Sequence, residues 1–88
     1  MAQFLIELPH TNEECLQAKD EVLAKGSEVL GNVVWGCEAG THTGWAWIEA
    51  ADADEARDMI AGDFLRPMAR VTEVKTYTPE QIRMLHAA

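Results

Sequence analysis

The sequence predicts a small α+β domain, and three observations indicate this class. Apolar residues alternate with other residues near the start of the chain, at Phe4, Ile6 and Leu8, which is typical of a half-buried strand. Two later segments begin with a capping box and carry apolar residues at helical spacing. The chain has 88 residues, 48% hydrophobic and 25% charged, so residues 1–88 have the composition of a single packed domain.

The first elements are a strand and a helix. A strand is expected over residues 2–8 and ends at Pro9-His10. The capping box Thr11-Asn12-Glu13-Glu14 then opens a helix, and Gly31-Asn32 stops it after about Leu30. The apolar stripe of this helix consists of Leu16, Leu23 and Leu30 with Ala18, Val22 and Val29.

A hairpin is expected next, with strands over about 33–39 and 42–50. Gly40 suits the tight turn between them. If Gly40-Thr41 is a two-residue turn, Cys37 lies opposite Gly44, and Trp35 lies opposite Ala46.

A second helix, a strand and a short terminal helix complete the chain. Asp52 and Glu55 form another capping box, and Arg66-Pro67 closes the segment that follows it. The inner face of this helix is expected to comprise Ala56, Met59 and Ile60, with Phe64 beyond them. The last strand is expected over 68–77, where the opposite parity of two valines would require a bulge if both were buried. Thr78-Pro79-Glu80-Gln81 opens the terminal helix.

The order strand-helix-strand-strand-helix-strand predicts a ferredoxin-like βαββαβ sandwich with a short C-terminal helix. Its helices would cover one face of the sheet, and the other face would be left for a partner, most simply in a homodimer. Three segments, Phe-Leu-Ile-Glu-Leu-Pro, Gly-x-x-x-Gly-Trp-Ala-Trp-Ile-Glu-Ala and Ala-Arg-Val-Thr-Glu-Val, resemble those of small dimeric α+β-barrel proteins. The chain is similar to muconolactone-isomerase-like proteins and to a ferredoxin-like family that includes nickel binders. Because that superfamily hosts isomerases, monooxygenases, haem proteins and metal binders, the resemblance implies a fold and a dimer more than a function.

The charge of the chain excludes some classes of partner. The net charge of −8 argues against nucleic acid and anionic membranes, which are bound by clustered lysine and arginine. The N-terminus has neither a signal peptide pattern nor a membrane-spanning run, so we expect a cytoplasmic protein with reduced cysteines or metal ligands. Residues 1–55 carry eleven acidic and two basic side chains, which leaves a non-catalytic subunit or adaptor for a basic partner as one hypothesis.

The sharpest candidate site combines His10, Cys15, Cys37 and His42. With Thr11 as N-cap, His10 and Cys15 occupy the two positions that a hydrophobic staple brings together. The ends of the first strand and of the hairpin lie at the same end of this fold, so we expect all four side chains to converge. Thiolate and imidazole suit a transition metal ion, namely Zn, Ni, Cu or Fe.

Other interpretations of the same residues stay open. Cys15 and Cys37 could be a redox pair, or simply small buried apolar residues beside surface histidines. Glu38 beside Cys37 is either an additional oxygen ligand or solvated.

A second candidate site lies on the predicted helix-free face of the sheet, at Trp45, Trp47, Glu49 and Glu7. In a dimeric barrel this face encloses a cavity, where a carboxylate could act as general base on a small-molecule ligand. This predicts an enzyme of the isomerase or monooxygenase type. The alternative is that the tryptophans anchor the dimer interface.

Overall fold

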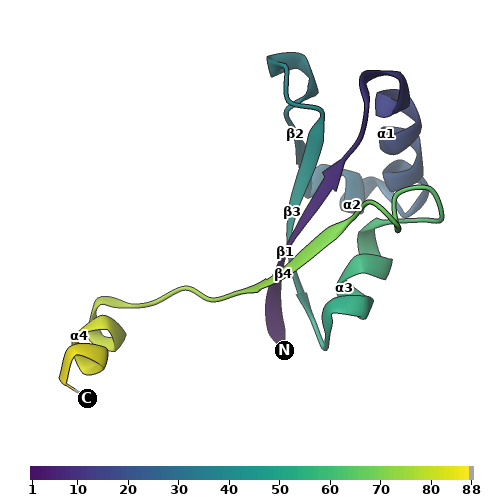
Figure 1. The fold of residues 1–88 in the computed structure, drawn as a ribbon. Helices are drawn as coiled ribbons and strands as arrows, with labels where there is room; N and C mark the ends of the chain where they lie inside the picture. The colour runs from purple at the N-terminus through teal and green to yellow at the C-terminus, as the bar shows by residue number, and fades with distance from the viewer. Residues whose placement is uncertain (88) are drawn as a thin grey trace.

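The computed structural model describes residues 1–87 and has an α+β architecture built on one antiparallel sheet (Figure 1). Its strands are β1 (Ala2–Pro9), β2 (Val33–Trp35), β3 (Thr43–Ala50) and β4 (Arg70–Val74). They lie in the order β2-β3-β1-β4, so the first strand is central and the last forms an edge. This order is compatible with the predicted ferredoxin-like sandwich.

Helices cover one face of this sheet, and the C-terminal helix stands apart from it (Figure 1). The α-helices are α1 (Cys15–Ala24), α2 (Ser27–Gly31), α3 (Ala53–Ile60) and α4 (Pro79–Ala87). Two short 3₁₀ helices complete the secondary structure: η1 (Asn12–Glu14) lies between β1 and α1, and η2 (Cys37–Ala39) lies between β2 and β3. None of the helices within residues 1–87 is long and apolar enough to cross a bilayer.

The core lies between the sheet and α1 and α3. The alternation in β1 is confirmed, because Phe4, Ile6 and Leu8 are buried against the helices. The core is completed by residues of β2 and β3, by inward residues of α1 and α3, and by the segment after α3: Ala18, Val22, Val33, Ala46, Ile48, Ala50, Ala56, Ile60, Ala61 and Leu65. Burial of these side chains is the main favourable term for folding.

The first predicted helix is wrong in its length and in part of its inner face. The predicted capping box is present, with Thr11 as the N-cap of η1. The helix does not run to Leu30 but breaks at Gly26, whose φ of 135° is a left-handed backbone conformation that favours glycine. Leu16 and Leu23 are exposed rather than inward. At 100° per residue they lie about 100–160° around α1 from Ala18 and Val22, and these smaller residues bring the helix close to the sheet.

The predicted hairpin is wrong in its turn and its register. β2 ends at Trp35, which pairs with Gly44 rather than with Ala46, and Cys37 lies in η2 instead of pairing in the sheet. Packing explains this register. Atoms of the Trp35 ring lie 2.9 Å from the position that a Cβ on residue 44 would occupy, so any side chain there would force the indole to move.

The loop between β2 and β3 has its own hydrogen bonds in place of a two-residue turn. The Gly36 N–H donates to the Thr43 carbonyl at 3.0 Å, and the Thr41 N–H donates to the Gly36 carbonyl at 2.9 Å. Gly40 ends η2 with a φ of 99°, a left-handed conformation that favours glycine, and is not part of a two-residue turn. Gly36 leaves room for an indole, because a Cβ there would lie 3.0 Å from the Trp45 ring.

The second half of the chain follows the predictions more closely. The Asp52 side chain caps α3 by accepting the Glu55 N–H at 2.8 Å, but Met59 is 42% exposed and not part of the inner face. β4 is shorter than the predicted strand over 68–77 and contains no bulge. Val71 pairs with Ile6 and Val74 with Gln3 in one continuous register, so the two valines lie on opposite faces.

Candidate metal centre

Four side chains with metal-binding atoms meet at the end of the sheet where β1 ends. One nitrogen or sulfur atom from each of His10, Cys15, Cys37 and His42 lies within 4.8 Å of the corresponding atoms of the others. We call these four residues the Cys/His cluster. The predicted convergence of two segments distant in sequence is therefore present, although the hairpin that carries Cys37 differs from the prediction.

Backbone hydrogen bonds hold the two segments in place. The pairing of β1 with β3 continues by one step beyond the strands, because the His10 N–H donates to the His42 carbonyl at 3.0 Å. The Thr11 N–H donates to the Glu14 carboxylate at 2.8 Å, which directs the chain from β1 into the first turn before Cys15. Each ligand residue thus lies at the end of an ordered element and not on a free loop.

The imidazole of His10 is oriented as a metal ligand would be. Its Nδ1 lies 2.9 Å from the Leu8 carbonyl oxygen. Because a carbonyl can only accept a hydrogen bond, Nδ1 carries the proton and Nε2 carries a free lone pair. That Nε2 lies 3.3 Å from the Cys37 sulfur. Proteins commonly orient a metal-bound histidine by a hydrogen bond from the ring nitrogen that does not bind the metal to a backbone carbonyl.

His42 brings a nitrogen that has no partner. Within residues 1–87, its Nδ1 is the buried side-chain nitrogen or oxygen that lacks a hydrogen bond. An unsatisfied buried polar atom costs about 1–3 kcal/mol, so such atoms are rare unless they serve a function. Coordination of a metal ion would satisfy this nitrogen.

The two cysteines are free thiols with different environments. Cys37 is buried, and burial together with the hydrogen bond to Cys15 raises the pKa of its thiol. The Cys37 thiol and the Lys19 ammonium, which lies 3.2 Å from the Cys15 sulfur, lower the pKa of Cys15. The hydrogen bond to Cys15 also raises the pKa of Lys19. The two cysteines can therefore hold one negative charge between them, on the Cys15 thiolate beside the Lys19 ammonium.

Lys19 and Trp35 are parts of this site that the sequence interpretation missed. Lys19 lies four residues after Cys15 on the same face of α1, and this spacing was the available signal. Its ammonium lies 5.7 Å from the centre of the Trp35 ring. The same ring packs edge-on against His10, with centroids 5.9 Å apart. Glu38 is exposed and lies outside the four-residue group.

The spacing of the donor atoms fits a tetrahedral ion. Zinc bonds of about 2.0–2.1 Å to nitrogen and about 2.3 Å to sulfur place neighbouring ligand atoms about 3.3–3.8 Å apart. The largest separation in the Cys/His cluster is 4.8 Å, so a closing movement of about 1 Å suffices. The chemistry of the donor set, two thiolates and two imidazoles, suits Zn²⁺ and related transition metals.

The second predicted site lies on the helix-free face of the sheet. Leu5 pairs with Trp47, and Glu7 pairs with Trp45, so these side chains share the face as predicted. Both tryptophans line an open hollow of about 240 Å³, together with Leu5, Asn32, Val34 and Ala46. The carboxylates of Glu7 and Glu49 are on the same face but are not among the described residues that line the hollow.

The chain was compared with protein families, curated proteins and solved structures. No family model, no curated protein and no solved structure matches the chain.

Proposed function

We propose that this chain is a small transition-metal-binding protein with a ferredoxin-like fold. One ion, most simply Zn²⁺, is held by His10, Cys15, Cys37 and His42. The observation that carries the proposal is the pair of imidazole nitrogens. Nε2 of His10 is directed at a thiol, and Nδ1 of His42 is buried without a partner. Both nitrogens and both sulfurs fall in one group whose atoms lie within 4.8 Å.

A metal site explains this arrangement better than a chance grouping of four side chains without a common function. Buried polar atoms are normally hydrogen-bonded, and His42 Nδ1 is not. Two thiolates neutralise a divalent cation, so the loaded site adds no net charge beside the apolar core. The Lys19 ammonium and the Leu8 carbonyl then act as outer partners that favour the thiolate and orient the imidazole.

The ligand count favours binding over catalysis at this site. A catalytic zinc keeps one coordination position for water or substrate, whereas a set of four protein ligands closes a tetrahedral shell. The ion would cross-link the ends of β1 and β3, α1 and η2. We therefore expect it to stabilise the fold, in the manner of a structural or stored metal.

The test is metal analysis of untagged protein purified without chelator. We expect about one transition metal ion per chain, and Co²⁺ substitution should give the visible d–d bands and the sulfur-to-metal charge-transfer bands of a tetrahedral thiolate site. Cys15→Ser and His42→Ala should each lose the ion or bind it much more weakly. His86→Ala is the matched control, because His86 lies on exposed α4 and should leave the metal content unchanged.

Two outcomes would contradict the proposal. One is a protein that binds neither zinc nor cobalt and has two free thiols. The other is a Cys15–Cys37 disulfide in a protein that binds no metal after reduction, which would support the redox-pair interpretation instead.

A further inference from the structure

The C-terminal arm, residues 75–87, is unlike the rest of the chain. After β4 it continues extended over residues 75–78 and then forms α4, which Figure 1 shows well away from the sheet and the other helices. Every residue from 75 to 87 is exposed. The molecule therefore measures 51 Å in its longest dimension but only 28 and 22 Å in the others.

This arm carries the apolar side chains of a packing helix. Ile82 and Leu85 share one side of α4. Arg83 and Glu80 form a 2.8 Å ion pair on the other side, next to Met84. The start of α4 is well formed, since the Gln81 N–H donates to the Thr78 hydroxyl and the Thr78 N–H donates to the Gln81 side chain.

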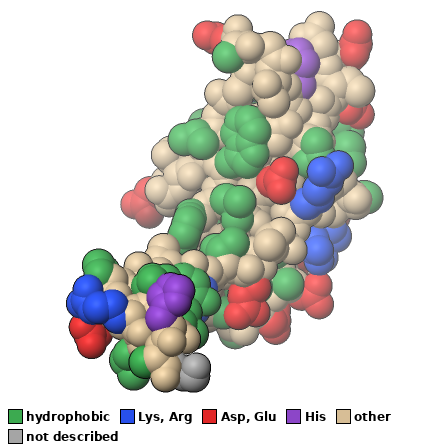
Figure 2. All heavy atoms as spheres, turned by 60° about the vertical axis from the view of Figure 1, so that its left-hand side comes forward, with side chains coloured by type: hydrophobic (Ala, Val, Ile, Leu, Met, Phe, Trp, Pro, Cys, Tyr) green, Lys and Arg blue, Asp and Glu red, His purple; other side chains and the backbone are tan. Residues whose placement is uncertain are grey.

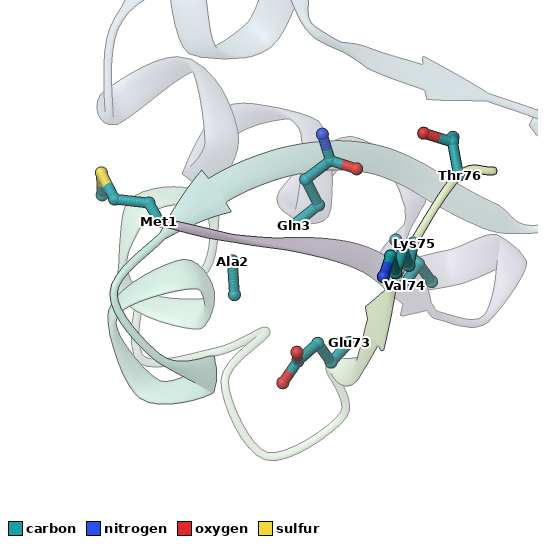
Figure 3. Close-up of a pocket in the computed structure, with 7 residues that line it drawn as sticks. All are labelled: Met1, Ala2, Gln3, Glu73, Val74, Lys75 and Thr76. Atoms are coloured by element: carbon teal, nitrogen blue, oxygen red, sulfur yellow. The ribbon is translucent and has the colours of Figure 1, made fainter. Parts of the chain in front are cut away.

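A helix of this length needs a surface to pack on. α4 has nine residues, and isolated helices shorter than about 12–15 residues are marginal in water. The sheet offers α4 no such surface at the root of the arm, which is the point where the arm leaves β4. It borders an open hollow of about 300 Å³ between the start of β1 and the end of β4, lined by Met1, Ala2, Gln3, Glu73, Val74, Lys75 and Thr76 (Figure 3).

The helix-free face of the sheet is the matching unpartnered surface. It carries the 240 Å³ hollow around Trp45 and Trp47. Val34 is 65% exposed and Trp47 is 51% exposed. Figure 2 shows hydrophobic side chains gathered over this face and again on the arm. Large apolar side chains left in water on both surfaces are typical of an interaction site.

Charge and reach indicate that the partner is a second copy. Residues 1–74 carry 14 acidic and five basic side chains, a net charge of −9, whereas the arm has one acidic and two basic side chains, a net charge of +1. Opposite charges favour contact between the arm and the body of a chain. The extended tether adds about 13 Å and α4 about another 13 Å, and Figure 1 shows both running away from the sheet of their own chain.

We propose that two copies of this chain exchange their C-terminal arms, with the apolar side of α4 from each copy packed over the tryptophan-lined hollow of the other. Ile82 and Leu85 are the anchors, and Leu5, Val34, Trp45 and Trp47 receive them. The arrangement is symmetric, because each chain supplies one arm and one face. It is independent of the Cys/His cluster, which lies at the end of β1 opposite to the root of the arm.

The first test is the molar mass of the full chain in solution, measured by light scattering over a range of concentrations. Wild type should have twice the chain mass of 9.8 kDa. In the double variant Ile82→Glu/Leu85→Glu the dissociation constant should rise at least about 100-fold, since each lost anchor removes the burial of a large apolar side chain. Glu80→Gln, on the polar side of the same helix, keeps the arm basic and should leave the dimer intact.

The second test locates the arm. A photoreactive amino acid at position 85, in a mixture of ¹⁵N-labelled and unlabelled chains, should cross-link one labelled chain to one unlabelled chain at peptides containing Leu5, Val34 or Trp47. Wild type that stays monomeric, a dimer unaffected by Ile82→Glu/Leu85→Glu, or cross-links confined to one chain would each overturn the proposal. The metal content of the arm variant should equal that of wild type, so failure here is distinguishable from failure of the metal site.

Discussion

Gly44→Ala tests whether packing beneath the Cys/His cluster sets the register of the hairpin. The added methyl would lie 2.9 Å from two Trp35 ring atoms and 3.1 Å from Val33 Cγ1, where ordinary contacts begin at 3.4 Å. The ring must move by about half an ångström or more, and it already packs edge-on against His10. Overpacking of this kind costs about 1–3 kcal/mol.

The magnitude can be converted into a melting temperature. An unfolding entropy of about 2.1 cal/mol/K per residue amounts to about 0.18 kcal/mol/K for 88 residues. The cost then corresponds to a decrease in Tm of about 5–16 °C in thermal unfolding followed by circular dichroism. Displacement of Trp35 toward His10 should also weaken Co²⁺ binding about 10- to 100-fold, as losses around metal ligands commonly do.

Matched controls make this reasoning refutable. Gly31→Ala adds the same methyl at the end of α2, where nothing lies within 4 Å, so stability should be unchanged or slightly increased. In a Trp35→Leu background the ring is gone, and Gly44→Ala should cost less than about 1 kcal/mol. If Gly44→Ala is neutral in wild type, or costs the same in both backgrounds, the packing argument is wrong.

Two further predictions follow from named contacts. Glu21 accepts two backbone N–H groups of the segment after α3, both at 2.8 Å, so Glu21→Gln should lower the free energy of unfolding by about 1–3 kcal/mol in urea titrations. Exposed Glu28→Gln should change it by less than about 0.5 kcal/mol, and equal effects of the two variants would contradict the role of Glu21. In metal-free protein at neutral pH, iodoacetamide should alkylate Cys15 before buried Cys37, as followed by mass spectrometry, because the Cys15 pKa is lowered and the Cys37 pKa is raised. Lys19→Met should slow Cys15 alkylation at neutral pH and not at a pH well above the thiol pKa, while faster reaction of Cys37 would refute this assignment.

Much of the secondary structure is encoded locally. The capping boxes at Thr11 and Thr78 and the Asp52 cap depend on side chains three residues apart, and all three are present. Strand alternation is equally local, so the sharing of one face by Trp45 and Trp47 could be predicted from their spacing alone.

The errors in the helix and hairpin arise where tertiary packing overrides the local pattern. Leu16 and Leu23 suggested the inner side of the first helix, but the smaller Ala18 and Val22 face the sheet. Gly40 suggested a two-residue turn, yet the contact of the Trp35 ring with Gly44 selects a longer loop. The convergence of the four side chains was still predicted correctly, because Cys37 lies near the end of β1 whether it belongs to η2 or to a longer strand.

The sequence by itself determined the element order, the caps, the alternation of faces in β1 and β3 and the identity of four residues with metal-binding chemistry. Only the tertiary structure decided the hairpin register, the break at Gly26, the unpartnered nitrogen of His42, the placement of Lys19 beside Cys15, and the course of the C-terminal arm. The physical reason is range. Caps and alternation depend on residues a few positions apart, whereas register, burial and the closing of a site depend on which distant side chains fill the same space.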